Sequence, residues 1–457
     1  MKKDYLGLKY LFLLFACAFV FFFTKQAQFT FPQSVSSTIF SASVLATLLF
    51  WESRVAIAFL GIAALILTKT IDIEHLILFS SLEVILFLVG MMVIVGLLRE
   101  VNFFNWILCH LVCLKKMSAK KLFVIICLSS ALLACLVDEV SSIIFMTALV
   151  FILAELFEVK AFPLLIAAIM STNIGSTGTV LGNPIGILIA TKAGLTFEDF
   201  IFRAFPLMVL VLAVTIAILL FWYRNEIQKM DAKIKEIGGN KKIFKKLICV
   251  PMTSEIRKEA IIFFITLFFI GLHSRLEHMF SLPKNALLLS MPLISSGFIM
   301  LWRREKAREY IENHVDWWTL IFFMLLFAKV GTLKYTGVTD ILSRGIAMLA
   351  HGNQFFMITF VLWLAAIGSS ILDNVVLVAT FIPVIQELKT MGIETTVLWW
   401  ALLFGGCLGG NITMVGSTAN IVALGMLEKK YKLYINFFQW LKVGLVIGLV
   451  STAIVWF

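Results

Sequence analysis

Three acidic side chains lie in the middle of long apolar segments, where an ionisable group is costly and usually functional. Asp138 and Glu139 are adjacent between two uncharged runs, and Asp373 occupies a similar position in the second half of the chain. Burial and mutual repulsion favour the protonated form of such carboxyl groups, whereas a bound cation favours the ionised form. These carboxylates could therefore exchange a proton for a metal ion, with Asp138 and Asp373 as the main ion-binding groups.

Neutral oxygen ligands for a hard cation are available in two polar stretches of otherwise apolar sequence. The residues that we expect to supply them are Thr172, Asn173, Ser176, Asn411, Thr413 and Asn420. An alternative role for Asp138 and Asp373 is helix capping, because each precedes an apolar run and a carboxylate stabilises a helix N-terminus. Both roles can hold together.

Lys329 is the one basic residue deep in a repeated element, and it has two interpretations. It could neutralise Asp373 as a charge partner, or it could extend its amino group to the nearby membrane surface. Cys135 and Cys407 lie close to the predicted site in sequence, which would suit a thiophilic substrate such as arsenite. The simpler interpretation of both cysteines is that they are small buried side chains.

The composition excludes an ordinary water-soluble protein. Of the 457 residues, 61% are hydrophobic and 14% are charged, whereas about 25% charged residues are usual in soluble domains. The net charge of +11 is expected to collect in cytoplasmic loops, so it gives little support to nucleic-acid binding. The sequence predicts an all-α polytopic protein in the inner cell membrane, with the lipid bilayer as its main partner.

The apolar runs predict about eleven transmembrane helices. They lie near residues 1–23, 37–50, 55–67, 76–98, 162–191, 200–222, 260–272, 286–302, 317–331, 397–427 and 437–457. The most basic connection, 224–258, has ten Lys and Arg against four acids, and smaller basic clusters lie at 115–121 and 303–308. The positive-inside rule places all three in the cytoplasm and, with them, the N-terminus.

Two further apolar stretches, 122–157 and 355–388, are predicted to be re-entrant hairpins with the carboxylates at their tips. The uncharged runs on the two sides of Asp138 and Glu139 have 16 and 15 residues, which span only about 24 Å against a bilayer core of roughly 30 Å. We expect the first hairpin to enter from the cytoplasm and the second from outside.

The two halves of the chain form an internal repeat. Leu86-Phe87-Leu88 matches Ile321-Phe322-Phe323, and Asp138 matches Asp373, both at an offset of 235 residues. After each hairpin follows a long Gly-rich run, 161–191 and 395–427, and an Asn-Ile pair in each run suggests an offset of 238. Since Gly weakens helices, each run is predicted to be a helix broken within the membrane. Inverted repeats with broken helices are typical of secondary transporters, although close packing through small residues is an alternative.

At these residues the chain resembles the ion transporter superfamily, in particular the ArsB/NhaD group of arsenite permeases, sodium/proton antiporters and P-protein relatives. Asp138-Glu139-Val140 resembles the Asp-Asn-Val hairpin tip of the group, and its second copy is Asp373-Asn374-Val375. Asn173 to Pro184 and Gly410 to Asn420 resemble its two broken-helix motifs. The resemblance implies that Asn374, Asn183 and Ser417 belong to the binding site, that the protein is a homodimer, and that it works by an elevator-like movement.

The domain organisation expected from these features has four parts. They are an extra N-terminal helix (1–35), a first repeat (36–223), a basic cytoplasmic linker (224–258) and a second, inverted repeat (259–457). The most favoured function is exchange of sodium or lithium for protons, and the alternatives are efflux of arsenite or antimonite and transport of a small di- or tricarboxylate or inorganic anion. Enzyme and Walker motifs are missing from the sequence, so neither an enzyme nor a cofactor is expected, and no structural metal.

Overall fold

The computed structural model describes residues 4–112, 118–237 and 251–457, and within these ranges it contains helices and no strand. The predicted all-α polytopic class is confirmed. Lys115 and Lys116 of one predicted basic cluster and residues 238–250 of the predicted linker lie outside the described residues.

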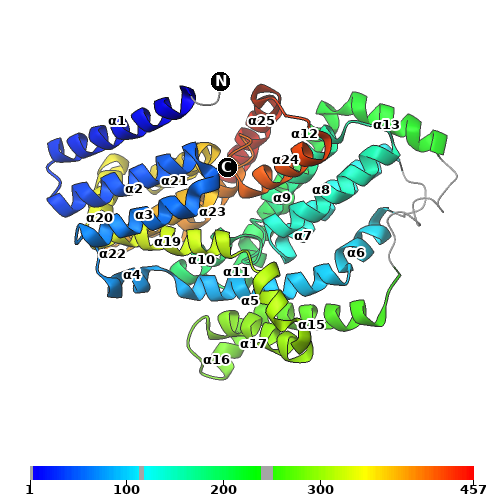
Figure 1. The fold of residues 1–457 in the computed structure, drawn as a ribbon, viewed down its shortest axis with the longest axis horizontal. Coiled ribbons are helices and arrows are strands. Elements are labelled where there is room, and N and C mark those ends of the chain that lie inside the picture. The colour runs from blue at the N-terminus through cyan, green and yellow to red at the C-terminus, as the bar shows by residue number, and fades with distance from the viewer. Residues whose placement is uncertain (1–3, 113–117, 238–250) are drawn as a thin grey trace. The chain divides into compact units, whose positions relative to one another are not determined.

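The chain forms two compact units, each built from segments far apart in the sequence (Figure 1). Unit 1 comprises Met1–Leu88, Asp316–Phe360 and Val375–Trp399, and unit 2 comprises Val89–Val315, Val361–Asn374 and Trp400–Phe457. Each unit takes segments from both predicted repeats, and the predicted domain boundaries stay a prediction.

Helices that lie within unit 1 are α1 (Asp4–Gln26), α2 (Phe31–Leu49), α3 (Arg54–Leu67), α4 (Ile73–Phe79), α19 (Trp317–Tyr335) and α20 (Val338–Ala350). Helices shared by both units are α5 (Leu82–Glu100), α21 (Gln354–Ile371), α22 (Asn374–Thr390) and α23 (Thr396–Gly409). The longer helices of unit 2 are α6 (Phe103–Val112), α7 (Ala119–Leu136), α8 (Glu139–Leu156), α9 (Ala161–Gly175), α10 (Pro184–Ala193), α12 (Phe205–Trp222), α13 (Arg224–Ile237), α15 (Ser254–Gly271), α16 (His273–Met279), α17 (Ala286–Trp302), α24 (Thr418–Tyr431) and α25 (Phe437–Trp456). Short elements complete the fold at η1 (Trp51–Ser53), α11 (Phe197–Asp199), η2 (Phe200–Ala204), η3 (Arg304–Lys306), α18 (Ala307–Glu309) and η4 (Tyr310–His314).

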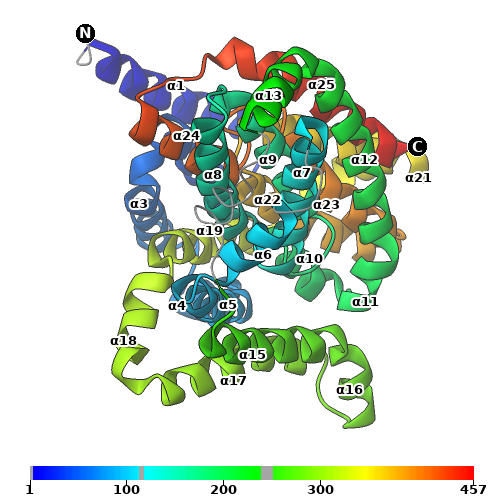
Figure 2. The same cartoon turned by 90° about the vertical axis from the view of Figure 1, so that its right-hand side faces the viewer.

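Among the described residues, eight helices are long and apolar enough to cross a bilayer, or up to ten if each of two bent pairs counts as one crossing. One bent pair joins α15 to α16 at 63°, and the other joins α17 to the segment Arg304–His314 at 105°. In Figure 2, α15 and α17 run side by side within unit 2, with α16 at the end where they connect. The protein is therefore an integral membrane protein.

The first predicted hairpin is formed by α7 and α8, which meet at Asp138 (Figure 1). The hydroxyl of Ser142 on α8 donates to the carbonyl of Ser130 on α7 at 3.1 Å, so the two arms run back along each other from the tip. Each arm has 18 residues, about 27 Å at 1.5 Å per residue. These helical arms are longer than the uncharged runs in the sequence had predicted. The reason is that the helices include charged residues that flank those runs. The second predicted hairpin region forms α21 and α22, with Asp373 between them.

Both Gly-rich runs are interrupted helices. The first consists of α9 and α10 with residues 176–183 unwound between them, and the second consists of α23 and α24 with residues 410–417 unwound. Asn183 and Ser417 cap the helices that follow the breaks, through the N–H groups of Gly186 and Ala419.

The two breaks share a pattern of close contacts within unit 2. A Cβ added to Gly175 would lie 2.3 Å from the carbonyl oxygen of Ala131, and one added to Gly409 would lie 2.1 Å from that of Ala366. Thr179 and Thr413 each donate to a hairpin carbonyl, of Cys135 and Ser370, at 2.5 Å. These pairs are 234 or 235 residues apart in sequence. Asn173 and Asn411, at the offset of 238, therefore do not occupy equivalent positions: Asn173 lies inside α9, and Asn411 follows the end of α23.

Replacing Gly175 by Ala is expected to lower the free energy of unfolding by about 1–3 kcal/mol, because the added methyl group would overlap backbone atoms that cannot rotate away. Gly297 in α17 is the matched control, since a Cβ there meets no atom within 4 Å and Ala favours a helix by up to about 1 kcal/mol. Thermal denaturation of the detergent-purified variants measures both effects. A Gly175→Ala protein as stable as Gly297→Ala would contradict the close approach of α9 and α7.

Helix α13, in the predicted cytoplasmic linker, is attached to both ends of the first hairpin. The carboxylate of Asp231 accepts the backbone N–H of Ala119 at the start of α7, at 3.0 Å. Lys233 pairs with Glu158, just beyond the end of α8, at 2.8 Å. The Ala119 N–H holds the pKa of Asp231 below its usual range, so this attachment is present at neutral pH and weakens as the pH falls through the lowered pKa.

Candidate ion-binding site

The tip of the first hairpin places two carboxylates in different surroundings. Asp138 is the N-cap of α8 and accepts the backbone N–H of Ser141 at 2.7 Å, so the predicted capping role is confirmed for this residue. The guanidinium of Arg99 at the end of α5 adds an attractive charge. Glu139, the first residue of α8, is 2% exposed. It interacts electrostatically with Asp138 and with Asp373.

Asp373, between α21 and α22, and Asn374, the first residue of α22, belong to the same unit. Both side chains are buried, at 3% and 1% exposure. The hydroxyl of Thr418, the first residue of α24, donates to the Asp373 carboxylate at 2.8 Å. Since Glu139 also interacts with the side chains of Asn374 and Ser176, residues from two hairpins and a broken helix meet around its carboxylate.

Several buried oxygen atoms near the breaks and tips have no hydrogen-bond partner among the described residues. They are Glu139 Oε2, Asn374 Oδ1, Thr172 Oγ1 and Ser171 Oγ. Burying such atoms without a partner costs about 1–3 kcal/mol each. Carboxylate, amide and hydroxyl oxygens are the ligands that hard cations take in proteins. A proton or a cation bound here would remove part of this cost.

Asn173 holds the two broken helices together. Its amide nitrogen donates to Asn411 Oδ1 at 2.8 Å and to Asn420 Oδ1 at 2.9 Å, and its own Oδ1 accepts from Ser417 at 3.1 Å. Asn420 in turn donates to the carbonyls of Gly410 and Thr413, at 2.7 and 3.0 Å. The oxygens of these asparagines already accept protein hydrogen bonds, unlike Glu139 Oε2 and Asn374 Oδ1.

Asn183, Ser176 and Thr413 lie in the unwound segments, whereas Cys135 and Cys407 lie near the ends of α7 and α23. Asn183 donates to Ser176 Oγ at 2.9 Å and to Cys407 Sγ at 3.1 Å. Thr413 uses its hydroxyl to bind the second hairpin segment at Ser370. Cys135 donates to the carbonyl of Gly175 at 2.9 Å. These residues shape the breaks around the carboxylates.

The described residues contain no group of three or more His, Cys, Asp or Glu that could hold a metal ion. The three carboxylates therefore do not converge on one metal in the manner of a structural site. A transported cation would need a carboxylate together with neutral oxygens.

Lys329 is only 2% exposed, and its side chain passes α3, where a Cβ added to Gly61 would lie 3.3 Å from Lys329 Cδ. The prediction that it extends to the membrane surface is therefore wrong, because neighbouring helices of unit 1 cover it. Asp373 belongs to unit 2, and the charge pairing of Lys329 with Asp373 stays a prediction.

Sequence reasoning did not single out Thr418, Ser171 or Arg99. Thr418 and Ser171 lie next to named residues in the recognised polar motifs. Their position in the sequence could therefore have indicated a place in the site. Arg99 directly follows the transmembrane helix predicted near residues 76–98. Nothing in the sequence indicates its proximity to Asp138.

A polytopic helical protein with carboxylates at hairpin tips, polar breaks in two membrane helices and unpartnered oxygens between them belongs to the class of membrane transporters. Residues 44–405 match the citrate transporter family (CitMHS). The chain belongs to this family and is a secondary transporter.

Relatives along nearly the whole chain agree with this assignment. An uncharacterized transporter of Mycobacterium tuberculosis is 30% identical over 430 residues, which cover 92% of this chain and 96% of the relative. The human P protein is 26% identical over 499 residues, which cover 92% of this chain and 59% of the P protein. An uncharacterized transporter of Synechocystis is 24% identical over 410 residues, which cover 85% of this chain and 88% of the relative. The resemblance to the ArsB/NhaD group is confirmed, and the family and these two bacterial relatives are described as transporters.

Proposed function

We propose that the protein exchanges sodium or lithium for protons across the membrane. The observation that carries this proposal is the buried carboxylate of Glu139, which interacts with the side chains of Asn374 and Ser176 and whose Oε2 has no hydrogen-bond partner among the described residues. A buried carboxylate oxygen without a donor is satisfied by a positively charged ligand, and a proton and a small hard cation are both suitable.

The exchange follows from competition for the same oxygens. When Glu139 is protonated, its O–H can donate to Asn374 Oδ1, whose side chain interacts with it. When Glu139 is ionised, Oε2 and Asn374 Oδ1 can coordinate a cation instead. Because the two forms exclude each other, each cation that enters displaces a proton. Asp138 and Asp373 keep the local potential negative, which favours either positive ligand over an empty site.

The test is proton movement in proteoliposomes that carry a preset pH gradient. Sodium, lithium, potassium, arsenite and citrate are added one at a time. We expect sodium or lithium to dissipate the gradient and potassium and arsenite to leave it unchanged. Absence of any response to sodium and lithium, in vesicles whose protein is folded and correctly inserted, would reject the proposal.

A second candidate, transport of a small carboxylate anion such as citrate, is favoured by the family match. Three carboxylates near the site repel a free polycarboxylate, so such an anion would bind only together with protons or cations that offset its charge. Dissipation of the gradient by citrate, with no effect of sodium or lithium alone, would select this candidate.

The proposal includes an elevator-like movement, a homodimer and a cytoplasmic N-terminus in the inner cell membrane. The basic clusters support the orientation, and the resemblance to the ArsB/NhaD group supports the movement and the dimer. No cofactor takes part in the proposed cycle. Labelling of single introduced cysteines from either side of the membrane tests the orientation.

A further inference from the structure

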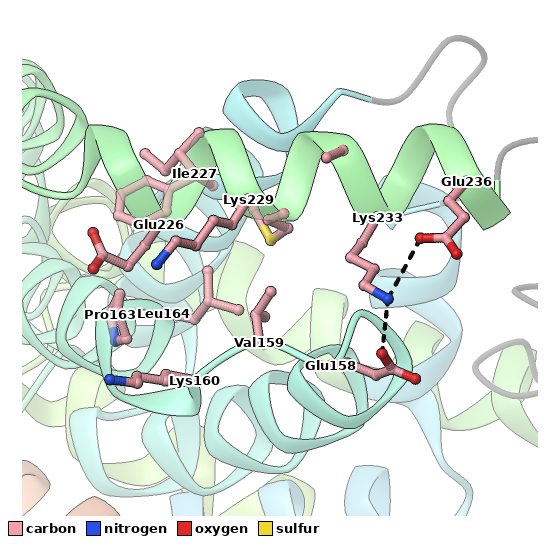
Figure 3. Close-up of a pocket in the computed structure, with 13 residues that line it drawn as sticks. Glu158, Val159, Lys160, Pro163, Leu164, Glu226, Ile227, Lys229, Lys233 and Glu236 are labelled. Atoms are coloured by element: carbon pink, nitrogen blue, oxygen red, sulfur yellow. Dashed lines mark hydrogen bonds and ion pairs between the residues drawn. The ribbon is translucent and has the colours of Figure 1, made fainter.

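A cavity of about 490 Å³ lies under α13 (Figure 3). The carboxylates of the proposed transport site are not among its lining residues. Its walls are α13, the start of α7 and the corner where α8 turns into α9, all within unit 2. A volume of this size lies in the range of pockets that bind small molecules.

The floor of the cavity is apolar. It is formed by the buried side chains of Phe123, Leu164, Ile227 and Met230. Ile227 and Met230 belong to the apolar face of the amphipathic helix α13, which packs toward the hairpin. This floor suits a hydrocarbon chain better than a fully hydrated ion.

The charged rim of the cavity differs between its two ends. At one end Lys233 is paired with Glu158 at 2.8 Å and with Glu236 at 3.4 Å. At the other end Lys229 on α13 faces Lys160 across the opening (Figure 3). Within the described ranges, neither of these two lysines makes an ion pair. At this end of the cavity, two lysines are accompanied by one carboxylate, Glu226, so the end carries a surplus of positive charge.

The cavity lies at the base of the first hairpin, where charged residues adjoin apolar helices. Lys120 and Lys121 flank the start of α7, and α13 follows the membrane helix α12. The positive-inside rule assigns this end of the hairpin to the cytoplasmic side. Anionic lipids are abundant in that leaflet, and basic pockets between membrane helices bind their headgroups.

We propose that this cavity binds an anionic phospholipid, with the phosphate held between Lys160 and Lys229 and the upper part of an acyl chain on the apolar floor. The ligand would bridge α13 and the corner before α9, next to the contacts of Asp231 and Lys233 with the hairpin. This site is separate from the transported ion, and its occupancy does not depend on the proposed sodium/proton exchange.

The test is native mass spectrometry of the detergent-purified full chain titrated with phosphatidylglycerol or with phosphatidylcholine. We expect retention of phosphatidylglycerol in preference to phosphatidylcholine, and about a tenfold weaker retention in the double variant Lys160→Gln/Lys229→Gln, in keeping with loss of two charge-assisted contacts. The double variant Lys258→Gln/Lys429→Gln removes the same charge from exposed sites that do not line the cavity. It is expected to retain phosphatidylglycerol like the parent protein.

A second variant, Ala232→Trp, tests the cavity itself by filling its space while leaving both lysines in place. It should also weaken phosphatidylglycerol retention. Equal retention of the two lipids, or equal weakening in the Lys258/Lys429 control, would overturn the proposal. Displacement of the lipid by citrate or inorganic phosphate at equal concentration would overturn it as well, since the site would then bind a free anion.

Discussion

Replacing Glu139 by Gln is expected to reduce sodium-dependent proton movement to the level of protein-free liposomes. The amide has nearly the same shape but can no longer release a proton or carry the charge that a cation needs. The loss should appear in the pH-gradient assay with sodium and with lithium. It should also appear as loss of the protein's stabilisation by sodium in thermal denaturation, because a ligand stabilises only a protein that binds it.

Glu155→Gln is the matched control for this result. Glu155 lies on the same helix, α8, but it is exposed and pairs with Lys430 at 2.8 Å, and exposed ion pairs contribute little. The control should transport at the parental rate. Parental transport by Glu139→Gln would show that the exchange takes place on another carboxylate.

Replacing Asn173 by Ala is expected to lower the free energy of unfolding by about 3 kcal/mol. The change leaves the Oδ1 atoms of Asn411 and Asn420 without the donor they share and removes the acceptor of Ser417, and each buried unpaired group costs about 1–3 kcal/mol. Thermal denaturation in detergent measures the loss. Asn105→Ala, at an exposed asparagine of α6, is expected to change stability by less than about 0.5 kcal/mol.

The variant Asn173→Asp separates a structural role from cation binding. A carboxylate at this position would be a stronger cation ligand but would present an acceptor to Asn411 and Asn420, which are acceptors already. A structural role therefore predicts a protein less stable than the parent at every sodium concentration. An Asn173→Asp protein with unchanged stability and tighter sodium binding would show instead that Asn173 is an ion ligand.

Much of the arrangement around the site could be predicted from the sequence. The carboxylates mark the hairpin tips because charged side chains are rare in membrane segments and usually functional, and the dense glycines mark the breaks because they weaken helices. The choice among polar residues could not be predicted in this way. Asn173 and Thr172 are neighbours in sequence, yet one is fully hydrogen-bonded and the other has a free hydroxyl. That difference depends on which side chains from the other broken helix lie opposite.

Two errors have similar physical causes. The offset suggested by the Asn-Ile pairs is wrong because it rests on identical residues. In the structure, the equivalent positions of the two breaks are the glycines at which backbones approach each other closely. One interpretation placed the amino group of Lys329 at the membrane surface because Gly331, Thr332 and Lys334 follow it, but the helices that cover it come from distant parts of the chain.

The close approach of α9 to α7 at Gly175 limits how the protein can open. With backbone against backbone at Gly175 and Thr179 bound to the carbonyl of Cys135, no layer of side chains separates the two helices at this point. Two helices slide past each other most easily through a layer of side chains. We therefore expect the first hairpin and the first half of the broken helix to move together as a rigid body. Access to the carboxylates must then change at the outer faces of this rigid body, and a disulfide engineered between α7 and α9 should leave turnover intact.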